Sequence, residues 1–302
     1  MFRQEKKYYA RAFLYALAMA AVLLAPFVLL DGGYFVYYGD YNAQQIPFYK
    51  TCIEAVQSGN LGWNWRTDLG ANFVGSYSFY TLGSPFFWFA ALFPVEISQY
   101  LMAPLLALKI ACSSFFAFVY IRRFVTNPQH ALIGGLLYAF SGYSMYNIFF
   151  NHFHEAIVFF PLLLIGLEES VVNKRRGALA AAVAINAFVN YFFFIGQVLF
   201  LVIYFICKLT TKDFPMNVRL FVRLAFESLL GAALGFVLLW PAVLSILQNP
   251  RTIDLSSGWG FLTYSKVQQY LAILLSWILP PDSPYITSIW SEGIIKWTSM
   301  SA

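Results

Sequence analysis

The sequence has few charged residues and few of the residue types that make disulfide or metal sites. Only 11% of its 302 residues are charged, whereas soluble domains carry about 25%. Its three cysteines are scattered without a CxxC pair, which excludes a disulfide framework and a cysteine-based zinc site. The GxSxG, P-loop and GxGxxG signatures of common enzymes are missing. No basic face of a soluble domain is visible, so nucleic acid is not an expected partner.

Apolar residues are what the chain has in excess: 60% are hydrophobic and 20% aromatic, with a mean hydropathy of +0.64. A soluble core could not bury so many apolar side chains, but a bilayer could. The sequence therefore predicts an all-α polytopic membrane protein with about seven transmembrane helices. The predicted spans are Ala12–Leu30, which we interpret as an uncleaved first span, and Ser98–Ile121, Ala131–Phe150, Ala156–Val171, Gly177–Phe194, Gly196–Cys207 and Ala225–Leu247.

The distribution of Lys and Arg predicts the orientation of these spans. With the N-terminus inside, 13 of the 19 basic residues fall on inner segments, five on outer segments and Lys109 within a span. We therefore expect a multi-pass membrane protein with a cytoplasmic N-terminus. Residues 1–302 form one transmembrane domain in this interpretation, with residues 31–99 as a large first extracytoplasmic loop and residues 248–302 as a second extracytoplasmic segment. The chain resembles the N-terminal part of a longer membrane protein.

Two helical features are expected within the first outer loop. Apolar residues from Ile46 to Val56 recur at helical spacing, and Pro47 suits the first turn, which predicts an amphipathic helix on the membrane surface. The run Ser78–Phe93 is also apolar, but a full crossing there would reverse the orientation of every later loop. It is interpreted as a re-entrant or interfacial piece.

Two charged residues are candidates for chemistry. Asp40 lies shortly after the first span, next to Gly39. It is either a solvated turn residue or a catalytic base or metal ligand at the membrane surface. Lys109 lies near the middle of a predicted span, where an ionised side chain costs about 2.5–3.5 kcal/mol. It is expected to face a polar cavity or an anion, unless it forms an internal ion pair.

Two short polar segments supply the other candidates. In the stretch Asn151 to Glu155, His152, His154 and Glu155 could bind a divalent metal ion or line a polar pocket. In WNWRTDLGANF, Arg66 could hold a phosphate or only pair with Asp68 on the surface. No cofactor is required by these residues, and a divalent metal ion stays open as an alternative.

The segments around Asp40, WNWRTDLGANF, SFYTLGSPF and FSGYSMYNIFFNHFHE resemble the YfhO family of bacterial membrane proteins. That family is similar to the GT-C glycosyltransferases, which take a sugar from a polyprenyl-phosphate carrier on the outer face. The resemblance implies an inverting, GT-C-like enzyme that adds sugar to a cell-wall polymer such as teichoic or lipoteichoic acid. A transporter or flippase of the lipid-linked sugar is the alternative, and a non-catalytic assembly subunit is a third.

The resemblance also implies roles for individual residues. Asp40 occupies the position of the family's catalytic acidic residue in the first outer loop. A polyprenyl phosphate leaves as a stabilised anion, so one base and positive charge suffice. The expected substrate-binding residues are Lys109, Arg66, Asp68, Asn72, Asn42, Gln45, His152, His154 and Glu155; Asn42 and Gln45 could bind sugar hydroxyls or only cap the following helix.

Overall fold

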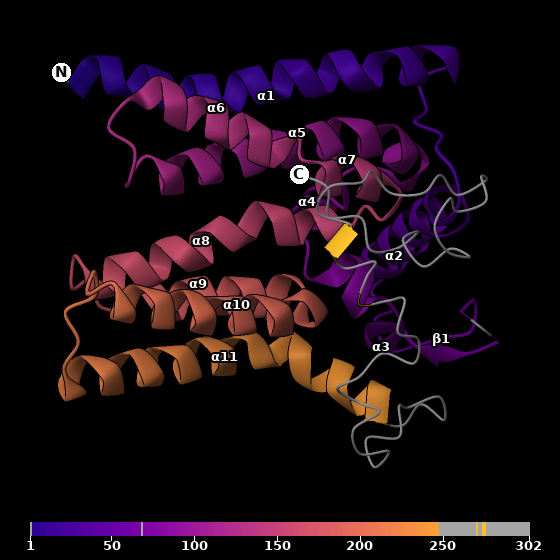
Figure 1. Cartoon of the computed structure of the whole chain (residues 1–302). Helices are drawn as coiled ribbons and strands as arrows, with labels where there is room; N and C mark the ends of the chain where they lie inside the picture. The colour runs from indigo at the N-terminus through magenta and orange to yellow at the C-terminus, as the bar shows by residue number, and fades with distance from the viewer. Residues whose placement is uncertain (1, 68, 248–269, 271–273, 276–302) are drawn as a thin grey trace.

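The computed structural model describes residues 2–67, 69–247, 270 and 274–275. Its long helices lie side by side in a bundle, with successive helices running in alternating directions (Figure 1). The connections α5–α6, α8–α9 and α10–α11 lie at the same end of the bundle as the N-terminus. The bundle helices are α1 (Phe2–Leu30), α5 (Ser98–Ile121), α6 (Pro128–Ala139), α8 (Phe153–Val171), α9 (Ala178–Val189), α10 (Tyr191–Thr210) and α11 (Val218–Leu247).

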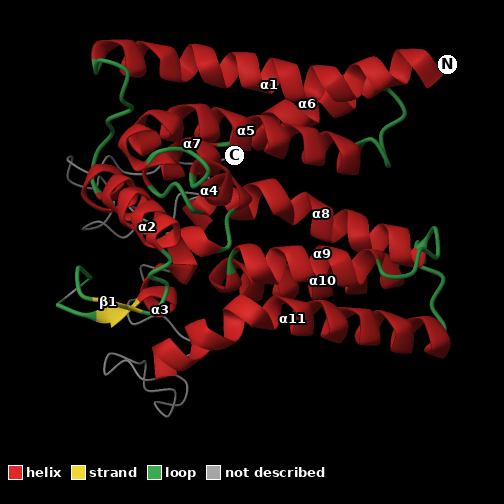
Figure 2. Ribbon diagram, turned by 180° about the vertical axis from the view of Figure 1, so that it is seen from behind, coloured by secondary structure: helices red, strands yellow, loops and turns green. Residues whose placement is uncertain are grey.

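Short elements gather at the opposite end of the bundle, where α2, α3 and β1 lie between the ends of α1 and α11 (Figure 2). Two-residue strands β1 and β2 pair antiparallel, with Trp63 opposite Asn72. The elements of this part are η1 (Tyr41–Gln45), α2 (Ile46–Ser58), β1 (Trp63–Asn64), β2 (Ala71–Asn72), α3 (Phe73–Tyr77), η2 (Ser78–Leu82), α4 (Pro85–Ala90), η3 (Val95–Ile97), α7 (Gly142–Tyr146) and η4 (Asn147–Phe149).

Four helices of the described bundle have the length and hydropathy that a membrane span requires, which confirms the all-α polytopic prediction. Within the described residues, Lys6–Leu30, Val95–Ile121, Tyr191–Thr210 and Val218–Ser245 are long and apolar enough to cross. Most of the apolar window of α5 is buried, 67%, against only 6% of that of α10, so α5 is the central helix and α10 lies at the periphery. Exposed apolar side chains recur along one face of α10, as lipid contact requires: Phe192, Ile195, Leu199, Ile203 and Ile206.

The predicted span Ala131–Phe150 is wrong as one continuous helix. Helix α6 ends at Ala139, and α7 begins only after Ser141, whose hydroxyl accepts from the backbone N–H of Ser144 over 3.4 Å. The 12 residues of α6 extend about 18 Å, less than the roughly 30 Å of hydrocarbon. The apolar side chains on both sides of Ser141 hide this break from a hydropathy argument.

The predicted boundary between the spans Gly177–Phe194 and Gly196–Cys207 is also wrong. The break between the fifth and sixth spans falls at Asn190, and Gly196 lies inside α10. Asn190 has an extended backbone, and its side-chain oxygen accepts from the N–H groups of Phe192 and Phe193 over 3.2 and 3.3 Å. An Asn cap of this kind starts a new helix. These hydrogen bonds place the break at Asn190, whereas Gly196 keeps a helical conformation despite its flexible backbone.

The predicted helix after Ile46 is confirmed as α2, with Pro47 in its first turn and a left-handed Gly59 at its end. Cys52 and Ile53 on its apolar face are completely buried and belong to the same cluster as residues of α5. The apolar face of α2 therefore packs against protein. The run Ser78–Phe93 is no single crossing helix, because Gly83 separates the short helices η2 and α4.

Close helix packing makes Gly231 in α11 a sensitive position. A Cβ atom there would lie 2.4 Å from the carbonyl oxygen of Ala180 and 2.7 Å from Cβ of Val183, both in α9. We expect Gly231→Ala to destabilise the fold by about 1–3 kcal/mol, measured as a lower melting temperature in detergent. Gly196→Ala is the matched control, because nothing lies within 4 Å of its added Cβ. An equal loss in both variants would contradict this packing.

Candidate functional site

A buried ion pair joins α5 to the start of α8. The Lys109 ammonium lies 2.7 Å from Glu155 Oε1, with 0% and 3% of the two side chains exposed. The ammonium also donates to the backbone oxygen and to Oδ1 of Asn151, over 3.0 and 2.9 Å. An ammonium has three N–H groups, so each finds an acceptor here. Of the alternatives for Lys109, the internal ion pair is the one that the structure contains.

The carboxylate of Glu155 connects this pair to the segment before α4. Ser84 donates its hydroxyl hydrogen to Glu155 Oε1 and accepts from the N–H of Phe87 over 3.2 Å. The second oxygen, Oε2, is buried and has no hydrogen-bond partner within the described part of the chain. A buried carboxylate oxygen without a donor is costly. This atom is therefore a ready acceptor for a donor group that enters the site.

His152 lies beside the pair and is almost completely buried. Its Nδ1 donates to Gln45 Oε1 over 3.1 Å, and its ring meets Phe79 and Tyr80 edge-on at centroid distances of 4.6 and 4.8 Å. Burial, followed by the Lys109 charge, lowers the pKa of His152 well below its usual range. The ring is therefore neutral near pH 7, and Nε2, which has no partner among the described residues, presents a lone pair.

His154 serves a different contact. Its Nε2 lies 3.0 Å from the carbonyl oxygen of Ser144 in α7, which ties α8 to α7. Residues 2–67 and 69–247 contain no group of three or more His, Cys, Asp or Glu that could hold a metal ion. The geometry of the described residues gives the divalent-metal alternative no support.

Asp40 lies half-buried just before η1, after a left-handed Gly39 with φ +58°. Its carboxylate makes no hydrogen bond or ion pair with any described residue. Burial and, next, the negative charge of Asp40 raise the pKa of Tyr80, so the carboxylate acts on the same Tyr80 that contacts His152. Asp40 thus lies near the buried cluster without being neutralised by it.

Three predicted amide ligands use their polar groups within the fold. Gln45 is buried, and its Oε1 accepts the hydrogen bond from His152 Nδ1. Asn42 pairs with the backbone N–H and C=O of Tyr37, accepting from the former over 3.0 Å. Asn72 caps α3 by accepting from the N–H of Gly75 over 2.8 Å. These contacts within the fold account for the polar side chains of all three residues. The predicted ligand Asp68 lies outside the described residues.

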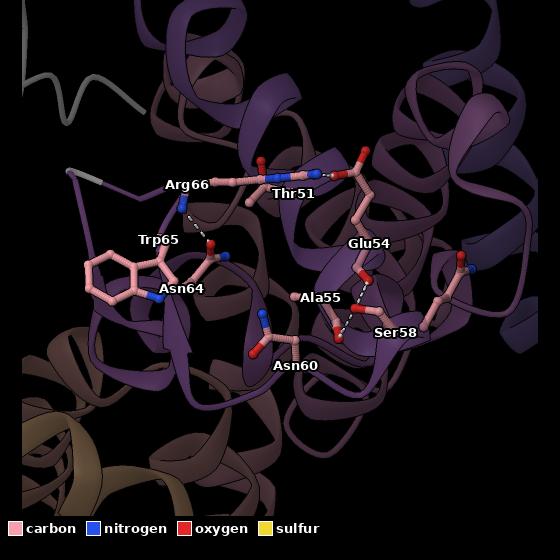
Figure 3. A pocket seen from close by; sticks show the side chains of 9 residues that line it. Thr51, Glu54, Ala55, Ser58, Asn60, Asn64, Trp65 and Arg66 are labelled. Atoms are coloured by element: carbon pink, nitrogen blue, oxygen red, sulfur yellow. Dashed lines mark hydrogen bonds and ion pairs between the residues drawn. The ribbon is translucent and has the colours of Figure 1, made fainter.

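Arg66 lies in a separate cleft of about 670 Å³ on the exposed side of α2 (Figure 3). Its guanidinium lies 3.1 Å from Glu54 Oε2, and 80% of the Arg66 side chain is exposed. Arg66 thus forms a surface pair with Glu54, and its predicted pair with Asp68 involves a residue outside the described part of the chain. The structure does not join Arg66 to the buried cluster: the cleft is lined by Thr51, Glu54, Ala55, Gln57, Ser58, Asn60, Asn64, Trp65 and Arg66.

Sequence reasoning missed Ser84 and Tyr80 as members of the buried site, and it included Asn151 in a candidate stretch without its role as an acceptor for Lys109. Ser84 before Pro85 is a typical helix start, which would have placed its side chain at the N-terminus of α4. No local pattern, however, indicates that this hydroxyl meets Glu155, 71 positions later in the chain. Tyr80 is one of 20 tyrosines, and its ring contact with His152 depends on tertiary packing.

The lowered pKa of His152 predicts a pH-dependent stability. An unfolded histidine takes up a proton near pH 6.5, whereas folded His152 does so only at lower pH. Stability contributed by neutral His152 is therefore lost as pH falls below 6.5 toward the folded pKa, by at most about 1.4 kcal/mol per pH unit. Between pH 7.5 and 5.5, His152→Gln should show a shallower fall in melting temperature than the wild type. His130→Gln, at an exposed position, should keep the wild-type slope, and equal slopes for His152→Gln would exclude this assignment.

The helical bundle and its buried polar cluster define a polytopic α-helical membrane protein. The family model described as bacterial membrane protein YfhO matches residues 11–270, and the chain belongs to this family. It is 25% identical over 242 residues to the uncharacterized protein YfhO of Bacillus subtilis (strain 168). That match covers 73% of this chain and 28% of the relative, so the chain spans well under half of the relative's length. No solved structure gives a significant match.

Proposed function

We propose that the chain takes part in moving a sugar from a polyprenyl-phosphate carrier to an extracytoplasmic polymer such as teichoic or lipoteichoic acid. The observation that supports this most is the free, half-buried carboxylate of Asp40. Asp40 directly precedes η1 and α2, and α2 lies at the end of the bundle opposite the N-terminus (Figure 1). In this proposal the N-terminus is cytoplasmic, which the basic residues at its end of the bundle favour.

Asp40 acts as the general base in this proposal. Its carboxylate takes the proton of the acceptor hydroxyl while that oxygen forms the new bond to the anomeric carbon of the sugar. The bond from that carbon to the phosphate oxygen breaks, and the polyprenyl phosphate leaves with the electron pair. Because this leaving group is a stabilised anion, no strong acid is needed. Attack opposite the leaving phosphate inverts the anomeric centre.

The buried cluster binds and orients the sugar in this proposal. His152 Nε2 and Glu155 Oε2 are hydrogen-bond acceptors without donors among the described residues, and sugar hydroxyls are donors. Lys109 is a positioning residue that holds Asn151 and Glu155 in place. The exposed Arg66 cleft, with Trp65 at its wall, suits the anionic acceptor polymer.

A transporter or flippase of the same lipid-linked sugar is the alternative. A charged pair buried inside a membrane bundle is also found on transport pathways, and Lys109 with Glu155 is such a pair.

One assay distinguishes the two functions. The protein is reconstituted into vesicles that hold a labelled polyprenyl-phosphate sugar, and teichoic acid is added as acceptor. Label that appears on the polymer, and is lost in Asp40→Asn, supports transfer. Label that crosses the bilayer but stays on the lipid, in both wild type and variant, supports transport and overturns the proposed transfer.

A further inference from the structure

The end of the bundle that holds the N-terminus carries a basic pocket of about 570 Å³. It lies between the connections α8–α9 and α10–α11, which Figure 1 places at this end. Four cationic side chains line it and no carboxylate does; the lining residues are Val171, Lys174, Arg176, Pro215, Asn217, Arg219, Leu220 and Arg223.

Several basic residues near this pocket form ion pairs, unlike three of the cations that line it. Arg123 and Arg175 both pair with Glu169, and Lys208 lies within 3.3 Å of Asp213. The positive-inside tendency alone would explain such residues. It does not explain why three cations that line one pocket have no carboxylate partner: no described residue forms an ion pair with Lys174, Arg176 or Arg219.

Arg223 lines the pocket and is held in place by contacts with α8 and with its own helix. Its guanidinium donates to the backbone oxygen of Ser170, and it forms an ion pair with Glu227, whose Oε1 lies 3.7 Å from Nε, too far for a hydrogen bond. That Nε is buried without an acceptor within the described part of the chain. A fixed guanidinium beside three unpaired cations offers the donors that phosphate oxygens require.

An apolar groove of about 240 Å³ begins one turn further along α11. Residues of α8, α9, α10 and α11 line it. Its wall residue Leu224 lies one turn from Leu220 of the basic pocket in α11, and Leu167 lies one turn from Val171 of that pocket in α8. Both Phe221 and Val202 are exposed on this helical surface. The groove is lined by Leu167, Leu179, Leu201, Val202, Phe205, Phe221, Leu224, Ala225 and Ser228.

We propose that the basic pocket and the adjoining groove together bind one anionic phospholipid, with its phosphate among Lys174, Arg176, Arg219 and Arg223 and an acyl chain along Phe221 and Leu224. The contiguity of charge and apolar surface fits an amphiphile better than a free anion. Basic pockets between membrane helices bind anionic headgroups in this way. This lipid site lies at the end of the bundle away from Asp40, so it is independent of sugar transfer.

The test measures lipid affinity from the melting temperature of the purified chain in a zwitterionic detergent. Phosphatidylglycerol should stabilise the wild type, whereas phosphatidylcholine and inorganic phosphate should not. Each cation contributes about 1 kcal/mol near a phosphate, so Arg176→Gln/Arg219→Gln should bind phosphatidylglycerol about 30-fold more weakly. Both side chains are exposed, so the fold should survive their replacement.

Arg175→Gln is the matched control, because Arg175 is in the same connection but pairs with Glu169 outside the pocket. It should keep the wild-type affinity. Equal stabilisation by phosphatidylcholine, or unchanged affinity in the double variant, would overturn the proposal. An equal effect of inorganic phosphate would show an anion site without a lipid and would overturn the acyl-chain part.

Discussion

Lys109→Met should destabilise the protein by about 3–5 kcal/mol, because it leaves the buried Glu155 carboxylate without its cation. Only 3% of the Glu155 side chain is exposed, and its Oε2 already lacks a partner among the described residues. The variant also removes the donor that holds the backbone and side-chain oxygens of Asn151. The melting temperature in detergent, and the amount of folded protein recovered from the membrane, measure this effect.

A double variant that also replaces Glu155 separates the effect of the buried charge from the effect of lost packing. Lys109→Met/Glu155→Gln removes both charges and should recover part of the lost stability, since no carboxylate is then buried unpaired. Arg66→Ala is the control for an ion pair as such. Its partner Glu54 and its own side chain are 34% and 80% exposed, and exposed pairs contribute about 0–1 kcal/mol. A loss for Lys109→Met no larger than that for Arg66→Ala would show that burial does not strengthen the pair.

Asp40→Asn should lower sugar transfer by about 10²–10⁴-fold, the usual contribution of a general base. The amide has nearly the same shape but cannot accept the proton of the acceptor hydroxyl. Stability should hardly change, because the Asp40 carboxylate has no hydrogen bond or ion pair with a described residue to lose. Transfer of labelled sugar to the polymer, with melting temperature measured in parallel, checks both expectations.

Asp31→Asn is the matched control for Asp40→Asn. Asp31 is an exposed carboxylate at the end of α1, so its replacement changes the charge of the same region without touching the proposed base. Transfer should continue in that variant. Normal transfer by Asp40→Asn would exclude Asp40 as the base, whereas equal losses in both variants would indicate a general effect of loop charge.

The helix boundaries show which parts of the fold the local sequence pattern could predict. The limits predicted for α5, Ser98–Ile121, agree with the structure because each side of that span has a clear polar or charged flank. The breaks at Ser141 and Asn190 could not be located from hydropathy. Both arise from single side-chain caps within apolar runs, and hydropathy averages over such residues.

Some members of the site were predictable from the sequence, but the contacts between them were not. The cost of burying a charge identified Lys109, and the polar stretch before α8 identified His152 and Glu155. That stretch supplies the ligands of Lys109 from positions 42 and more residues away in the chain. The sequence did not show that Arg66 lies apart from this cluster. Only the structure places it in the separate cleft on the exposed side of α2.

The sequence by itself determined the class of protein and its likeness to the YfhO family, since hydropathy, charge bias and local motifs are properties of neighbouring residues. Only the tertiary structure decided which polar groups meet. It paired Lys109 with Glu155, seated Ser84 on that carboxylate and left Asp40 free. The physical reason is that a buried charge must find a partner wherever the packing of distant helices supplies one, and spacing along the chain does not record that packing.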